Sequence, residues 1–213
     1  MRLIERHHVQ CRKLIYERQP PCYLGRLFDR LDPLELAIVR RQAAWRSTPL
    51  VFRLATAVNT LGDGWLYAAL AILLLIVSGR TAWPSTLLAG ESMAIAHLVY
   101  PLIKYYVARP RPTSRDQELS FVRPLDRYSF PSGHVMTATA AFLPIGAAYP
   151  IIGLGLLVVW AMLVWARLIV AHHYPSDLIV GTVFGAAAVG AASLLLGSSL
   201  QFARAFFATI SSL

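Results

Sequence analysis

Charged residues are absent from three long stretches of this chain, and these stretches set the first expectation for its fold. Residues 64–79, 131–166 and 178–203 contain no Asp, Glu, Lys or Arg. A helix that crosses a bilayer needs about 20 mostly apolar residues, so stretches of this composition predict transmembrane helices that end at the intervening proline and glycine residues. The expected spans cover residues 65–78, 84–107, 132–149, 151–170 and 178–200.

The first 48 residues follow a different pattern, because they are polar and rich in arginine. Asp32 and Pro33 predict the cap and first turn of a short amphipathic helix over residues 34–45, which suits a helix on the membrane surface. Residues 50–61 are apolar but short, and Arg53 interrupts them. This pattern is compatible with either an interfacial segment or a re-entrant segment over residues 50–61.

The composition argues against a soluble domain. Hydrophobic residues make up 56% of the chain and charged residues 15%, whereas a soluble domain has about 45–50% and about 25%. We therefore expect an all-α fold, a polytopic transmembrane helical bundle of about five to six spans with an N-terminal interfacial segment. The expected parts are a basic arm with the interfacial helix (1–48), a transmembrane domain (49–204) and a C-terminal tail (205–213).

The net charge of +9 is concentrated in two places. Residues 1–53 contain 11 of the 20 Lys and Arg residues, and residues 104–127 contain another six. Basic residues beside apolar spans are typical of lipid-headgroup contacts and topology signals, and no nucleic-acid recognition motif occurs. The bilayer, and not nucleic acid, is the expected partner. Cys11 and Cys22 lack the spacing of a zinc site and are expected to be free thiols.

Polar residues occur where the predicted spans end, and the connectivity brings them to one face. Because successive spans cross in opposite directions, the end of the second, the start of the third and the junction of the fourth and fifth share one side. Ionisable groups at a bilayer are costly and mark functional sites. The converging residues are Lys104, Arg111, Ser132, Gly133, His134, Arg167, His173 and Asp177.

These residue types suit chemistry at phosphorus. Clustered cations repel one another unless an anion lies between them, and a phosphate matches their donors. A helix that starts at Ser132 and Gly133 adds backbone N–H groups and the positive end of its dipole. One neutral histidine can attack phosphorus while a second protonates the leaving oxygen, and Asp177 is the carboxylate available to orient His173. No magnesium-type carboxylate cluster or phosphate-binding glycine loop occurs, so no metal and no other cofactor is expected.

The order and spacing of these residues resemble the type 2 phosphatidic acid phosphatase family, which shares its site with vanadium haloperoxidases. The family's three motifs appear as Lys104 with Arg111-Pro112, as Pro131-Ser132-Gly133-His134, and as Arg167 with His173 and Asp177. One position departs from the pattern, because Ala166 stands where the family usually has Ser.

The resemblance implies a role for each matched residue. It makes His173 the nucleophile that forms a phosphohistidine, Asp177 the residue that orients it, and His134 the general acid and later the base. The phosphate-binding residues that it implies are Lys104, Arg111, Ser132, Gly133 and Arg167.

The apolar spans favour the membrane phosphatases over the soluble haloperoxidases. The resemblance then implies a metal-independent lipid phosphatase in a bacterial inner membrane. Its candidate substrates are undecaprenyl pyrophosphate, phosphatidylglycerophosphate, phosphatidic acid, a lipid A phosphate and a polyprenyl sugar phosphate. A lipid-to-lipid phosphotransferase would use the same intermediate, and an anion transporter would explain the cations but not the histidines. The sequence selects neither a substrate nor an oligomeric state.

Two arguments about the side of the membrane disagree. Related bacterial enzymes commonly place the site on the periplasmic face, often after an additional N-terminal span. With five spans, however, the arginine-rich N-terminus shares a side with the site, and the positive-inside rule then favours the cytoplasm. A crossing by residues 50–62 would instead move the site to the periplasm.

Other polar residues have simpler interpretations. His172 is expected to pack at the interface and not to act as the nucleophile. Asp63, between two glycines, is expected to cap the helix that follows. The remaining arginines around the first motif, namely Arg109, Arg115, Arg123 and Arg127, are expected in a solvated basic loop.

Overall fold

The computed structural model describes residues 22–211, and this part of the chain is helical apart from its connections. The α-helices are α2 (Cys22–Ala43), α3 (Pro49–Leu61), α4 (Trp65–Ser78), α5 (Trp83–Val107), α6 (Pro112–Arg115), α7 (Gly133–Ala148), α8 (Pro150–Ile169) and α9 (Pro175–Ser211). Short 3₁₀ helices occur at η1 (Ala44–Ser47), η2 (Gly79–Ala82) and η3 (Gln117–Leu119).

Helix α7 forms the centre of the bundle. It packs against α5, α8 and α9, and most of its side chains are buried, although α7 itself is only 16 residues long. Glycines on α9 allow the closest approach, since a Cβ at Gly185 would lie 2.5 Å from the carbonyl oxygen of Met136 and 2.7 Å from Cβ of Thr139. Small residues of this kind let membrane helices pack backbone to backbone.

The predicted transmembrane bundle is confirmed. Three described stretches are long and apolar enough to cross a membrane, namely Trp65–Val107, Pro150–Ile169 and Pro175–Leu195. The first contains both α4 and α5, which η2 separates, and α7 is a further, shorter apolar helix. The ends of α4, α5, α7 and α8 lie within one residue of the expected bounds, whereas α9 starts three residues earlier than expected and continues to Ser211.

The N-terminal part differs from the expectation in three respects. The interfacial helix begins at Cys22 and not at residue 34, so that Pro33 lies inside it. Residues 50–61 form helix α3. Asp63 does not cap α4, because Gly64, with a φ of 132°, holds the N-cap position and no side chain caps the helix.

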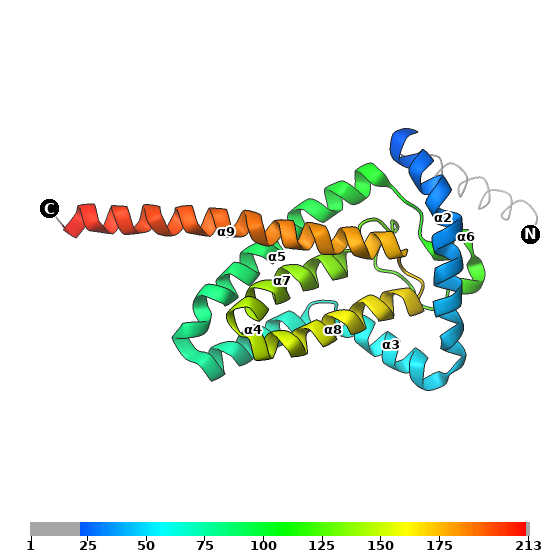
Figure 1. The fold of residues 1–213 in the computed structure, drawn as a ribbon, viewed down its shortest axis with the longest axis horizontal. Helices are drawn as coiled ribbons and strands as arrows, with labels where there is room; N and C mark the ends of the chain where they lie inside the picture. Colours follow the sequence, from blue (N-terminus) through cyan, green and yellow to red (C-terminus); the bar gives the residue numbers. More distant parts are fainter. Residues whose placement is uncertain (1–21, 212–213) are drawn as a thin grey trace, which may run out of the picture.

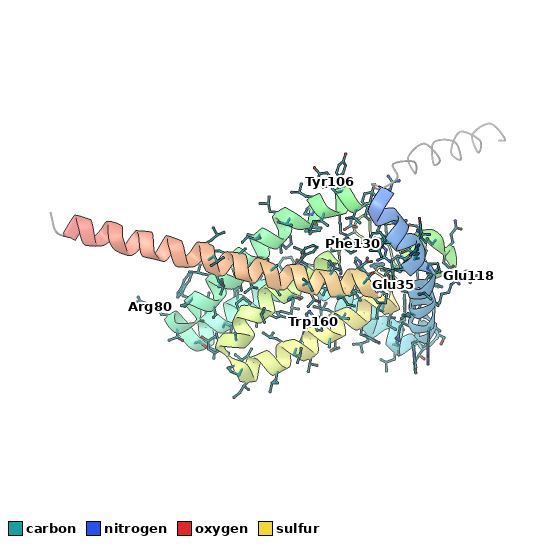
Figure 2. All side chains as sticks on the ribbon, turned by 45° about the horizontal axis from the view of Figure 1, so that its top comes forward. Glu35, Arg80, Tyr106, Glu118, Phe130 and Trp160 are labelled. Atoms are coloured by element: carbon teal, nitrogen blue, oxygen red, sulfur yellow. The ribbon has the colours of Figure 1, made fainter. Side chains whose placement is uncertain are left out.

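Helices α3 and α4 together pass along the bundle once. In Figure 1, α3 starts beside α2 and α4 ends at the far end of the bundle, with the glycine-rich break between them. Helix α2 lies across the end at which α5 finishes and α9 starts (Figure 1). Figure 2 shows Arg80 at the opposite end of the bundle from Glu35 and Glu118. The arginine-rich α2 and the converging polar residues therefore share one end.

Candidate active site

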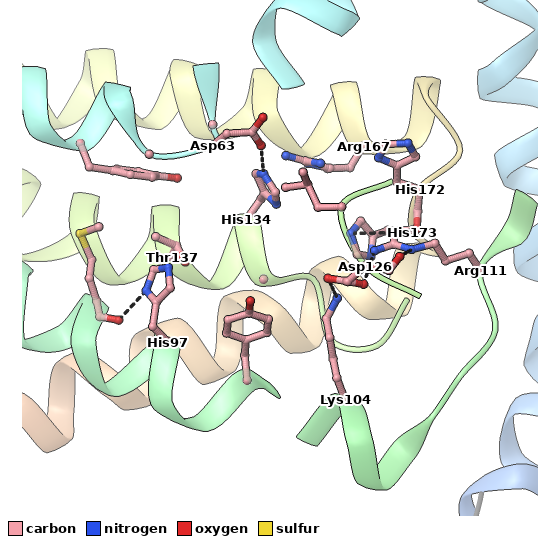
Figure 3. Close-up of a pocket in the computed structure, with 17 residues that line it drawn as sticks. Asp63, His97, Lys104, Arg111, Asp126, His134, Thr137, Arg167, His172 and His173 are labelled. Atoms are coloured by element: carbon pink, nitrogen blue, oxygen red, sulfur yellow. Dashed lines mark hydrogen bonds and ion pairs between the residues drawn. The ribbon is translucent and has the colours of Figure 1, made fainter. Parts of the chain in front are cut away.

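A cavity of about 320 Å³ lies among helices α4, α5, α7 and α8 and the loops that follow α5 and α8. Most of the predicted site residues line it, as Figure 3 shows, namely Lys104, Arg111, Gly133, His134, Arg167 and His173. Ser132 and Asp177 do not line it and have no exposed surface. The structure therefore brings together residues from three separate motifs, because α5 and α8 end where α7 and α9 begin.

His173 is held with one ring nitrogen toward the backbone and the other toward the cations. Its Nδ1 lies 2.7 Å from the carbonyl oxygen of Ser129, which only accepts, so Nδ1–H donates this hydrogen bond. Nε2 then carries the lone pair, which faces a guanidinium nitrogen of Arg111 at 3.5 Å. Burial, followed by the positive charges of Arg111 and Lys104, holds the pKa of His173 well below its ordinary value. A neutral imidazole with a free Nε2 is the form that can act as a nucleophile.

Asp177 acts on the loop more than on the imidazole. Its Oδ2 accepts a hydrogen bond of 2.8 Å from the backbone N–H of Tyr174, and its Oδ1 accepts one of 2.6 Å from Arg109. The distance from Oδ2 to Nδ1 of His173 is 3.6 Å, longer than a hydrogen bond of normal strength. The backbone carbonyl of Ser129 therefore orients the ring directly, and Asp177 fixes the turn that carries it.

Arg109 does not lie in a solvated loop, because its side chain has no exposed surface. Its guanidinium donates to Asp177, to Ser176 at 2.7 Å and to Asp32 at 2.7 Å. Glu35 of α2 accepts a further hydrogen bond from Arg109. The expectation for Arg109 was wrong because it treated the arginines as one group, whereas acidic residues 74 and 77 positions earlier in the chain pair with this one.

The three predicted phosphate-binding cations differ in their partners. Lys104 donates to Asp126 at 2.7 Å and to the carbonyl oxygen of Tyr128 at 3.0 Å. Arg111 donates to the other carboxylate oxygen of Asp126 at 2.6 Å. Among the residues that the structure describes, Arg167 makes one weak hydrogen bond, 3.3 Å from its terminal nitrogen to the carbonyl oxygen of Asn59, and its buried Nε has no partner. An anion in the cavity would complete the hydrogen bonding of Arg167.

Asp63 is a site residue that the sequence analysis missed. Its Oδ1 lies 2.5 Å from Nε2 of His134, and the dashed contact in Figure 3 marks this pair. The break between α3 and α4 makes the approach possible, since a Cβ at Gly62 would lie 3.2 Å from Cδ2 of His134 and 2.8 Å from Leu163. One sequence signal was available, because Asp63 is the only acidic residue between Glu35 and Glu91.

His172 also lines the cavity, although its ring is committed elsewhere. It is buried, and Nε2–H donates to the carbonyl oxygen of Val122 at 3.0 Å. Burial lowers its pKa to about 4, a shift that the hydrogen bond to Val122 opposes. The ring is therefore neutral and packs against the loop. His172 thus has a packing role, as expected, but it lies inside the protein and not at the membrane interface.

This geometry, with three cations and two histidines around one cavity in a membrane bundle, is the arrangement that the sequence predicted for a membrane-embedded phosphatase. The chain belongs to the PAP2 superfamily, which it matches over residues 85–199. It is 35% identical over 181 residues to decaprenylphosphoryl-5-phosphoribose phosphatase of Mycobacterium tuberculosis, a match that covers 83% of this chain and 98% of that protein. The enzyme of the same description from Mycolicibacterium smegmatis is 32% identical over 150 residues, covering 69% of this chain and 80% of that one.

Solved structures show the same fold. The phosphatidylglycerolphosphate phosphatase of Bacillus subtilis superimposes with a TM-score of 0.65 at 18% identity, covering 82% of this chain and 91% of that one. LpxE of Aquifex aeolicus gives a TM-score of 0.66 at 22% identity, covering 75% and 94%. The predicted membership of the phosphatidic acid phosphatase group is thus confirmed, and the protein is an integral membrane lipid phosphatase. Asp63 lies outside the matched family region.

Proposed function

We propose that this protein removes the terminal phosphate monoester from a polyprenyl-phosphoryl phosphosugar through a phosphohistidine at His173. The observation that carries the proposal is the unprotonated Nε2 of His173 in a cavity lined by three cations. The chain is 35% identical in sequence to the decaprenylphosphoryl-5-phosphoribose phosphatase of Mycobacterium tuberculosis over 98% of that protein, and this similarity supports such a substrate over other lipid phosphates. Because the site lies at the end of a membrane bundle, a lipid of this kind can place its phosphate in the cavity while its prenyl chain stays in the bilayer.

In the first step, the lone pair of His173 Nε2 attacks phosphorus and the bond from phosphorus to the sugar oxygen breaks. The leaving oxygen takes the bonding electrons and a proton from His134. Asp63 binds Nε2 of His134, so Nδ1 is the nitrogen that exchanges this proton. The carboxylate of Asp63 stabilises the imidazolium that a general acid requires.

In the second step, water attacks the phosphohistidine and gives one proton to His134. The bond between phosphorus and Nε2 breaks, its electrons return to His173, and inorganic phosphate leaves. Lys104, Arg111 and Arg167 stabilise the charge on the phosphoryl oxygens in both steps. Gly133 contributes a backbone N–H at the start of α7, and Ser132 supports this turn through its backbone, which donates to the carbonyl oxygen of Asp177 and accepts from the N–H of Met136.

The mycobacterial relatives and the apolar spans support a location in a bacterial inner membrane, with the lipid headgroup at the end of the bundle that α2 covers. Interfacial α2 would then lie in the headgroup layer beside the site.

Phosphate release from a panel of purified lipids tests this proposal. The panel contains polyprenyl-phosphoryl-5-phosphoribose, phosphatidylglycerophosphate, phosphatidic acid and undecaprenyl pyrophosphate. We expect the highest kcat/KM for the first, a loss of at least about 10³-fold for His173→Ala, and activity within about 3-fold of wild type for the neighbouring His172→Gln. Preference for another lipid would refute the assigned substrate, and equal losses for the two histidine variants would refute the assigned nucleophile.

A further inference from the structure

A carboxylate of the protein itself lies in the cavity that the phosphate is expected to enter. Asp126 lines this cavity, with one oxygen 2.7 Å from Nζ of Lys104 and the other 2.6 Å from Arg111 (Figure 3). Its backbone carbonyl accepts a third contact, 3.0 Å from Nε of Arg111. Asp126 thus bridges two of the three cations that define the site.

This carboxylate satisfies only part of the site. The third cation, Arg167, has no contact with Asp126 among the hydrogen bonds of the described residues, and its buried Nε has no partner. A planar carboxylate has two oxygens, and both are used on Lys104 and Arg111. A phosphate monoester has three terminal oxygens arranged around phosphorus, so it has one more oxygen to offer to Arg167. Asp126 is therefore an anion that fits the site incompletely.

The position of Asp126 allows it to leave. It lies in the connection between η3 and α7, outside every helix, and its side chain is 41% exposed, whereas that of Lys104 is 7% exposed. The carboxylate can therefore rotate into water, where its charge is solvated, without unfolding a helix. The two cations stay behind, because both are buried at the end of α5 and the start of α6.

We propose that Asp126 is a specificity-determining residue, an internal anion that occupies the Lys104–Arg111 part of the site and yields to a dianionic phosphate monoester but not to a monoanionic phosphodiester. This inference rests on the proposed function. A diester carries one negative charge, as Asp126 does, and gains nothing electrostatically by replacing it. A monoester carries close to two charges above pH 7 and reaches the third cation as well.

Such discrimination matters for the proposed substrate, because that lipid contains both groups. Its terminal phosphate is a monoester, while the phosphate that joins the sugar to the prenyl chain is a diester. Exclusion of the diester would prevent unproductive binding, in which the diester phosphate occupies the site in place of the terminal monoester. A phosphatase for a lipid with a single phosphate would have no such need.

Inhibition by a matched pair of soluble amphiphiles tests the proposal. Dodecyl phosphate is the monoester, and dodecyl methyl phosphate is its diester with the same chain. Inhibition constants are measured at pH 8 against release of phosphate from the preferred lipid. We expect wild type to bind the monoester at least about 100-fold more tightly, and Asp126→Asn to reduce this ratio about 10-fold, mainly through tighter binding of the diester.

Three further variants make the result decisive. Asp126→Glu keeps the charge and should keep the ratio within about 3-fold of wild type, and Asp126→Ser is a second neutral variant if the asparagine variant does not fold. Asp116→Asn is the matched control, since Asp116 pairs with Arg40 at 2.7 Å outside the cavity and its loss should leave the ratio unchanged.

The opposite result is equally clear. If Asp126→Asn weakens both inhibitors alike and lowers kcat, Asp126 positions the two cations and the proposal is wrong. An unchanged ratio in both neutral variants also overturns it. A wild-type protein that releases phosphate from no lipid refutes the proposed function instead, so the two failures are distinguishable.

Discussion

At the scale of single residues, the site consists of two imidazoles whose environments differ. His173 is bound through Nδ1 to a backbone carbonyl, whereas His134 is bound through Nε2 to the carboxylate of Asp63. A carbonyl fixes the neutral tautomer without adding charge, which suits a nucleophile. The carboxylate of Asp63 stabilises a protonated His134 ring against burial and the charge of Arg167, which oppose protonation, and this stabilisation suits an acid. These partners therefore distinguish the proposed roles of the two histidines.

The pairing of Asp63 with His134 predicts a coupled loss of activity. Asp63→Asn removes the charge that stabilises the imidazolium, and we expect kcat for the preferred lipid to fall about 10–100-fold. In a His134→Ala background the same substitution should have little further effect, because residues that act as a unit are not additive. Steady-state kinetics of the two single variants and the double variant provide the measurement. Multiplicative losses would mean that Asp63 acts independently of His134.

His172 predicts a pH dependence of stability. Its pKa is about 4 in the folded protein, against about 6.5 in an unfolded chain. The unfolded state therefore binds more protons below pH 6.5, and stability is lost as the pH falls toward 4. At pH 5, this difference in proton binding lowers the free energy of unfolding by about 2 kcal/mol relative to its value at high pH. We expect His172→Gln, which keeps a donor for Val122, to show a smaller drop in Tm between pH 7 and pH 5 than wild type. Equal drops would contradict the assigned shift.

At the scale of elements, α2 is part of the site's framework. Arg109 follows α5, and its guanidinium joins Asp32 and Glu35 of α2 to Asp177 at the start of α9. The guanidinium also lies between two rings, 4.3 Å from the centre of Phe28 and 4.0 Å from that of Tyr174. Arg109 thus pairs with three buried carboxylates, of which Asp32 also pairs with Arg115 at 2.5 Å.

Removal of this cation should destabilise the protein strongly. Arg109→Met keeps much of the side-chain volume but removes the ion pairs of Asp177 and Glu35 with Arg109, while Asp32 keeps its pair with Arg115. Breaking a buried pair in this way costs about 3–5 kcal/mol. The expected outcome is a much lower Tm in detergent and loss of phosphatase activity. Arg123→Gln, at an exposed position of the loop, is the control and should leave Tm unchanged. Similar Tm values for the two variants would show that α2 is not held through Arg109.

The sequence predicted the apolar helices well, because hydropathy and proline positions act locally. The ends of α4, α5, α7 and α8 follow directly from such signals. Span connectivity also brought the three motifs to one end. The partners of the site residues could not be predicted, since Asp63 and His134 are 71 residues apart and Arg109 and Asp32 are 77 apart. Such pairs depend on how the helices pack against one another, and this packing cannot be predicted from the hydrophobic pattern within either segment.

At the scale of the whole molecule, charge is distributed unevenly between the two ends of the bundle. Helix α2, the loop around the first motif and the cavity all lie at one end, and they contain most of the arginines. At the other end lies η2 with Arg80 (Figure 2). Helices α3 and α4 together pass along the bundle once, so α3 does not add a separate crossing that would move the site to the opposite side.

This asymmetry predicts that the site faces the cytoplasm, because arginine-rich segments near membrane spans stay on that side. In intact cells, the native N-terminal cysteines, Cys11 and Cys22, should therefore resist a membrane-impermeant maleimide, and labelling should need permeabilisation of the membrane. Thr81→Cys, in a background without native cysteines, places a thiol at an exposed position of η2, and this variant should react in intact cells. The reverse pattern would place the site on the outer face, where the arginines would bind anionic headgroups of the outer leaflet and the lipid phosphate would have to cross the membrane before hydrolysis.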